Sequence, residues 1–74
     1  MKSYSFDIEL IVMVRSQGLE RGTRKAIIPF ECDGTTTLAD FLDIINGKVN
    51  SKMTDMTREG ETLDRPRIAI VEKN

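Results

Sequence analysis

Residues 4–15 read YSFDIELIVMVR, and this stretch decides the fold. Side chains alternate in character along it. Every second residue is apolar: Tyr4, Phe6, Ile8, Leu10, Val12 and Val14. The residues between them, which are mostly polar, are Ser5, Asp7, Glu9, Ile11, Met13 and Arg15. Successive side chains of a β-strand point to opposite faces of a sheet, so a period of two predicts a long strand with one apolar face.

A second strand is predicted over residues 24–33, where the alternation returns after a break. Ala26, Ile28, Phe30 and Cys32 share one parity there. Pro29 has no backbone N–H to donate, which favours an edge position or a bulge. Between the two strands, Ser16–Thr23 contains two glycines and little to bury, so a long mobile loop is expected there.

The period changes from two to 3.6 after Asp33-Gly34, which predicts an amphipathic helix. Its apolar positions are Leu38, Phe41, Leu42, Ile45 and Val49. Thr36 or Thr37 can cap the first free amides, and Asn46-Gly47 is the expected stop, although Val49 would allow one further turn. We expect Leu38, Phe41, Leu42 and Ile45 to face the sheet residues Phe6, Ile8, Leu10, Ile28 and Ile70.

The remaining third of the chain has a weaker pattern. A short strand near residues 52–56 is one reading of Met53 and Met56, and residues 60–66 form a polar connection that Leu63 would anchor. A last strand is predicted over residues 67–72, with apolar residues on both faces, which suggests a central position. The fold class is therefore α+β: a mixed sheet of three to four strands with one helix across one face, in a single domain spanning residues 1–74.

Length and charge exclude several classes of protein. Seventy-four residues are too few for two domains, and 39% hydrophobic with 31% charged residues is typical of a soluble globular domain. The net charge of −1 supplies no global field for phosphate backbones, so nucleic-acid binding is not expected. One cysteine cannot form an internal disulfide, and no apolar run approaches the roughly twenty residues of a membrane span, so we expect a cytoplasmic protein with no membrane partner.

The element order resembles the ubiquitin-like β-grasp domains, in which a hairpin is followed by a helix across the sheet and a C-terminal strand beside the first. Residues 34–42, GTTTLADFL, look like the strand-to-helix junction of the small sulfur carriers. Residues 60–63, GETL, are similar to the leucine-bearing turn before the last strand of ubiquitin-like proteins. Carriers and modifiers of that family end in Gly-Gly, whereas this sequence ends VEKN, so their carboxylate chemistry is not expected here.

The sequence favours a protein without catalytic residues, cofactor or metal. It holds no histidine, which removes the usual general base and every histidine-containing zinc site. Cys32 belongs to the apolar parity of its strand and has no adjacent Lys or Arg to stabilise a thiolate, so a small core residue is expected. The acids are scattered, and the glycines near Arg21, Arg24 and Lys25 are followed by no helix that could bind an anion.

One surface stands out for binding. If one helix covers one face of the sheet, five apolar residues meet on the other face: Ile11, Met13, Ile27, Ala69 and Val71. We expect a non-enzymatic protein-interaction module that binds another protein, or a second copy as a homodimer, through this open face or a strand edge. The loop at Ser16–Thr23 covering these residues is the alternative structural reading. Other functions left open are an accessory or carrier-like subunit of an enzyme complex, a phage or mobile-element inhibitor of a host protein, and weak nucleic-acid binding through Arg15, Arg21, Arg24 and Lys25.

Overall fold

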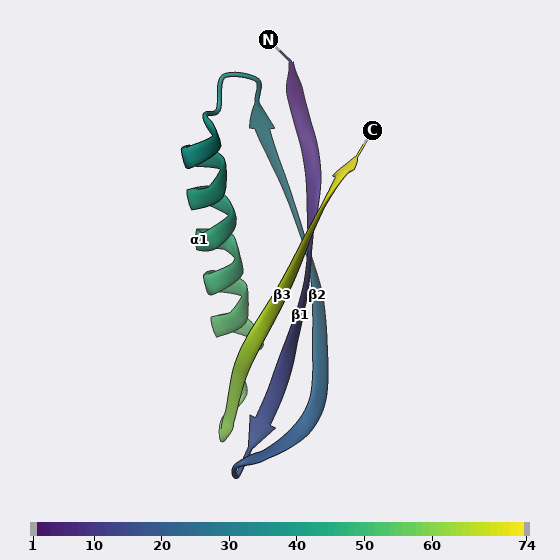
Figure 1. Ribbon diagram of the computed structural model, residues 1–74, viewed down its shortest axis with the longest axis vertical. Coiled ribbons are helices and arrows are strands. Elements are labelled where there is room, and N and C mark those ends of the chain that lie inside the picture. Colours follow the sequence, from purple (N-terminus) through teal and green to yellow (C-terminus); the bar gives the residue numbers. More distant parts are fainter. Residues whose placement is uncertain (1, 74) are drawn as a thin grey trace.

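The computed structural model describes residues 2–73 and has the order strand, strand, helix, strand (Figure 1). The elements are β1 (Ser3–Ser16), β2 (Leu19–Asp33), α1 (Leu38–Met56) and β3 (Glu61–Lys73). The strands form one antiparallel sheet in the order β2-β1-β3, with α1 packed on one face. The predicted α+β class, with a small sheet and one helix, is confirmed.

The hairpin between β1 and β2 is tighter than predicted. Only Gln17 and Gly18 lie between the strands, both with positive φ (55° and 75°), and Ser16 pairs with Leu19. Two residues with positive φ make the turn that matches the twist of a hairpin, and glycine adopts it without a Cβ penalty. The mobile loop expected at Ser16–Thr23 is therefore wrong. Apart from the two turn residues, the segment continues β1 and β2, so it is not a loop folded over the open face.

Helix α1 begins as predicted but runs two turns past its expected stop. Thr37 caps it by accepting a hydrogen bond from the amide of Asp40 at 3.2 Å. Gly47 does not end the helix, because the apolar stripe continues through Val49 and Met53 and packs against the core. The strand considered near residues 52–56 is therefore wrong, since those residues complete the helix.

The length of α1 also sets the direction of β3. Nineteen helical residues span about 28 Å, so α1 returns the chain to the hairpin end of the sheet. A short connection then pairs Glu61 with Ser16, the last residue of β1, and β3 can only run back antiparallel to β1. The sheet is thus antiparallel throughout and not mixed as predicted. β1 is the central strand, so the central position suggested for the last strand is wrong, while the edge position suggested by Pro29 is confirmed for β2.

A bulge in β3 changes which face of the sheet its side chains point to. Ile11 pairs with Arg67 and Met13 with Asp64, so Arg65 and Pro66 together oppose Val12, and Arg65 has a φ of 50°. An extra residue in one strand shifts its side-chain alternation by one. Leu63 and Ile68, an odd number of residues apart, consequently both point to the face that carries α1.

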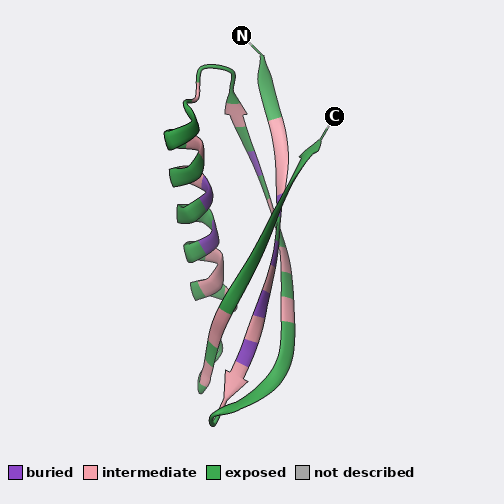
Figure 2. Ribbon diagram, viewed as in Figure 1, coloured by how far each residue is buried: buried purple, intermediate pink, exposed green. Residues whose placement is uncertain are grey.

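The core lies between β1, β2 and α1 (Figure 2). Its buried members are Ile8, Leu10, Val12, Phe30, Ile45 and Val49. Phe41 packs against this core as predicted, but Leu38 and Leu42 are 74% and 50% exposed, and Ile70 is 41% exposed. The prediction that these three residues belong to the core is wrong, because α1 contacts β2 and leaves the neighbouring half of the same face, over β3, uncovered.

Candidate protein-binding surfaces

The open face of the sheet, the face without α1, carries the five residues predicted to bind a partner. Alternation places Ile11 and Met13 of β1 opposite the buried Leu10 and Val12, and the register brings the other three beside them. Glu9 pairs with Ile27 on one side and with Ala69 on the other, and Asp7 pairs with Val71. Their exposure is unequal, since Ile27 is 62% and Val71 43% exposed while Ile11 and Met13 are half-buried.

Charged residues interrupt the apolar side chains of the open face. Ile11 lies between Lys25 and Arg67, and Glu9 lies between Ile27 and Ala69. Asp7 is ion-paired with Lys73 at 3.1 Å. The five predicted residues therefore share one face but form a mosaic with charges, which resembles an ordinary solvated sheet surface more than one continuous apolar patch.

The two edge strands differ in how they are protected from pairing. β2 carries Lys25 and Pro29 near its centre, and both discourage the addition of another strand. β3 carries four consecutive apolar residues, Ile68–Val71, which we call the β3 edge segment. All four are exposed, and Ile68, Ile70 and Val71 are 41–43% exposed. Among the described residues β3 pairs only with β1, so its outer edge is open along this segment.

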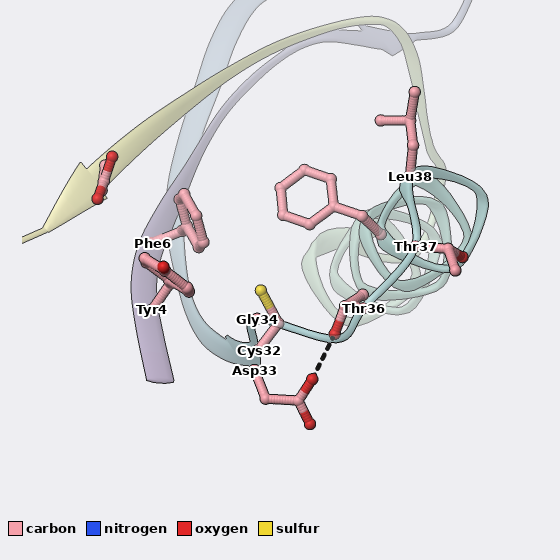
Figure 3. Close-up of a pocket in the computed structure, with 10 residues that line it drawn as sticks. Tyr4, Phe6, Cys32, Asp33, Gly34, Thr36, Thr37 and Leu38 are labelled. Atoms are coloured by element: carbon pink, nitrogen blue, oxygen red, sulfur yellow. Dashed lines mark hydrogen bonds between the residues drawn. The ribbon is translucent and has the colours of Figure 1, made fainter. Parts of the chain in front are cut away.

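An apolar hollow lies where the start of α1 stands away from the sheet, and its one lining residue from β3 is Glu72, which follows this segment (Figure 3). It has a volume of about 470 Å³, and its apolar lining comes from both strand and helix residues: Tyr4, Phe6, Leu38 and Phe41. Glu72 of β3 closes one side. Leu38, Leu42, Ile68 and Ile70 thus leave exposed apolar area on the helix-bearing face, and three of them, Leu38, Leu42 and Ile70, were predicted to belong to the core.

At the opposite end of the molecule, Arg24 connects the helix to the sheet. Its Nη1 donates to Glu61 Oε1 at 2.8 Å and to the carbonyl oxygen of Met56 at 2.6 Å, and its Nη2 donates to Glu61 Oε2 at 3.1 Å. This two-pronged contact joins β2, the last turn of α1 and the start of β3. Arg24 therefore holds the helix end on the sheet.

Two of the four basic residues considered for nucleic-acid binding, Arg15 and Arg24, are ion-paired within the chain. Arg15 Nε donates to Asp64 Oδ2 at 2.8 Å, and Arg15 Nη2 lies 3.7 Å from Glu20 Oε1. Arg24 is held by Glu61. Since these carboxylates already neutralise two of the four cations, few counterions would be released on binding a phosphate backbone.

Acid is expected to weaken the contact between Arg24 and Glu61. The hydrogen bond from Arg24 holds the pKa of the Glu61 carboxyl below its ordinary value of 4.5. A carboxyl whose pKa is depressed by folding stabilises the fold above its unfolded pKa and loses that effect as the pH falls through the folded pKa. We expect Glu61→Gln to lower the melting temperature at pH 7, and the gap from wild type to close as the pH falls below about 4.5. A gap that stays constant between pH 7 and pH 3 would contradict this role.

Asp33 provides a control for that titration at the other end of the molecule. Its Oδ1 accepts hydrogen bonds from the hydroxyl of Thr35 at 2.6 Å and from the Thr35 amide at 2.9 Å. The hydroxyl contact is the main cause that holds the pKa of Asp33 below its ordinary value of 3.8. The gap between wild type and Asp33→Asn should therefore begin to close at a lower pH than the gap for Glu61→Gln, because the ordinary pKa values are 3.8 and 4.5.

The side chains that could take part in catalysis or bind a metal are dispersed over the described residues. Cys32 is half-buried and lines the apolar hollow, whereas the carboxylate of Asp33 points away from it toward Thr36 (Figure 3). Within residues 2–73 no three metal-ligating side chains come together, and no helix there is long and apolar enough to cross a membrane. No protein-family model, curated protein or solved structure matches this chain. The geometry of the described residues therefore favours the β3 edge segment as the candidate functional site.

Proposed function

We propose that this protein is a non-enzymatic protein-interaction module whose partner binds along β3. The observation that carries the proposal is the β3 edge segment, four exposed apolar residues on an open strand edge with no proline or charge among them. An open edge offers backbone donors and acceptors to an added strand, and the alternate side chains supply apolar contacts. Ala69 and Val71, two of the residues predicted from the sequence, belong to this segment.

The surroundings of Cys32 support a binding role over a catalytic one. The hollow that it lines also contains Asp33 and Glu72, and neither Lys nor Arg is among its lining residues. Reactive cysteines usually lie in electropositive surroundings, and the residues that line this hollow supply no cation. We propose that the protein works without cofactor or metal. We further propose a cytoplasmic location, which the single cysteine supports.

We also propose a fold-level likeness to the ubiquitin-like β-grasp domains. The order of the elements, the helix across the sheet and the position of β3 beside β1 support it. The antiparallel direction of β3 departs from the mixed sheet that this likeness implied. The likeness extends to architecture, and a shared architecture does not carry an activity with it.

A pair of matched variants tests the proposed function. Ile70→Lys places a charge in the β3 edge segment, and Ile27→Lys makes the same change at an exposed position of the other edge strand. Each tagged variant and the wild type would be used as bait against native lysate and against an untagged copy of the chain, with circular dichroism to confirm folding. We expect wild type and Ile27→Lys to retain the same proteins, and Ile70→Lys to lose them.

Two results would overturn this proposal. Loss of binding in Ile27→Lys alone would place the partner on the open face or the β2 edge. Retention of the same proteins by the folded Ile70→Lys variant would show that β3 is not the binding surface.

A further inference from the structure

We infer that the occupant of the β3 edge is a second copy of this chain, so that two antiparallel β3 strands join two sheets into one sheet of six strands. The inference rests on the proposed function and names its partner. It is carried by three observations: the surface that a single chain leaves exposed, the register that β3 can form with itself, and the protection of the other edge.

A single chain exposes more surface than its size predicts. Its accessible surface is 5404 Å², whereas a folded monomer of 8.4 kDa is expected to expose about 4,600 Å². The excess of about 800 Å² is the area that each partner of a standard interface buries. The radius of gyration is 14.3 Å, against about 11 Å for a globular chain of this length.

The excess surface includes apolar side chains over β3, on the half of the helix-bearing face that α1 does not cover. Ile68 and Ile70 point to the helix-bearing face beyond the reach of α1, and Leu38 and Leu42 are exposed on α1 itself. A chain this small needs most of its large apolar side chains in the core. A neighbour along β3 would cover part of this area without any rearrangement of the core.

One register of β3 with itself is favourable. A two-fold axis at Ala69 pairs Ala69 with its own counterpart, Ile68 with Ile70 of the second copy, and Arg67 with Val71. Cross-strand pairs of β-branched residues stabilise antiparallel sheets, and this register opposes no like charges over these five residues. It also leaves Pro66, with its bulge, outside the paired segment.

The neighbouring registers are worse for identifiable reasons. An axis between two residues would shift the pairing by one residue and turn the helix-bearing faces of the two copies to opposite sides of the sheet. Only axes centred on a residue keep both helices on one face, and the nearest alternatives to Ala69 are Ile68 and Ile70. Centring on Ile70 places Arg67 opposite Lys73 of the other copy. Centring on Ile68 brings Pro66 into the ladder opposite Ile70, two residues from the axis, where it has no N–H to donate. In the register centred on Ala69, the first like charges that meet, Arg65 and Lys73, lie four residues from the axis, at the bulge.

The other edge strand of the sheet, β2, is less suited to pairing with a second copy. β2 carries Lys25 and Pro29, and the register sets Lys25 beside Ile11 and Pro29 beside Asp7. Pairing of β2 with a second β2 would place these residues within the new ladder. A dimer through β3 is therefore favoured over a dimer or an open chain of copies through β2.

The test uses Ala69→Lys and a control matched at the same cross-strand position. Glu9 lies directly opposite Ala69 on one side and Ile27 on the other, so Ala69→Lys and Ile27→Lys both place the new cation beside Glu9. Only Ala69→Lys also opposes its own copy across the proposed axis. Sedimentation equilibrium over a concentration series should show a dimer for wild type and Ile27→Lys, and an association about two- to fivefold weaker for Ala69→Lys.

A charge-swap experiment tests the position of the axis. Ala69→Glu alone should also associate weakly, because two carboxylates meet at the axis. An equal mixture of Ala69→Lys and Ala69→Glu should associate more tightly than either variant alone, since opposite charges then meet. Chemical denaturation of each variant at a concentration where all are monomeric checks that a loss of association is not a loss of folding.

The outcomes separate this inference from the proposed function. A wild-type chain that stays monomeric at every concentration, or a mixture that associates no better than its components, would overturn dimerisation about Ala69. If that monomer still binds another protein that Ile70→Lys loses, the proposed function stands with a different partner. If it binds none, both proposals fail.

Discussion

The Phe30→Ala variant is expected to lose at least about 3 kcal/mol of the stability of the fold. Phe30 is 5% exposed, and its ring centroid lies 5.3 Å from that of Phe6 and 5.7 Å from that of Phe41. Truncating a buried phenylalanine costs about 3–5 kcal/mol, and a chain of this length has a total stability of about 4–11 kcal/mol. The free energy of unfolding, measured by urea denaturation with circular dichroism, should fall by at least 3 kcal/mol, about the value expected for such a cavity.

Two comparisons show whether the loss comes from the buried ring. Phe30→Leu keeps much of the apolar volume and should cost clearly less than Phe30→Ala. Tyr4→Ala removes an aromatic ring that is 39% exposed at the margin of the same face, and it should leave the protein folded. A Phe30→Ala variant within about 1 kcal/mol of wild type would contradict the packing of the three phenylalanines.

The second large effect is expected at Ile45, one turn after Leu42 in the same helix. Ile45 is 4% exposed in the core, whereas Leu42 is 50% exposed beside the uncovered half of the sheet. Replacing a buried isoleucine by alanine costs about 2–5 kcal/mol, and alanine is a better helix former than either residue. We therefore expect Ile45→Ala to lose about 2–5 kcal/mol and Leu42→Ala less than about 1 kcal/mol.

The concentration dependence of these variants adds a further distinction. Because a neighbour along β3 would cover part of the exposed apolar area on this side of the molecule, the cost of Leu42→Ala should be measured at a concentration where wild type is monomeric. Equal losses for Ile45→Ala and Leu42→Ala under that condition would show that α1 lies closer to β3 than the structure places it.

Local features of the fold were predictable from the sequence because they depend on residues that are close along the chain. The alternation from Tyr4 to Val14 determined which side of β1 is buried, and the change of period at Leu38 determined where the helix begins. Pro29 predicted an edge strand through a property of a single residue, its missing N–H. The five open-face residues were placed on one face for the same reason, since alternation does not depend on distant contacts.

The continuous helical stripe could not show which of its residues reach the sheet. Leu38 and Leu42 fit the stripe as well as Ile45 and Val49 do, but their contact depends on how α1 lies across three strands. Gly47 was a reasonable stop by its intrinsic preference. Packing of the next two turns against the core outweighed that preference, which is about 1 kcal/mol.

The sequence by itself determined the elements, the two faces of β1 and the apolar content of the last strand. Only the tertiary structure decided that β3 runs antiparallel to β1 and lies at an edge, because that outcome depends on where a nineteen-residue helix delivers the chain. The bulge at Arg65 then turned Leu63 and Ile68 to the same face. The exposed β3 edge segment follows from these long-range constraints, since four apolar residues are buried in a central strand but remain accessible at an edge.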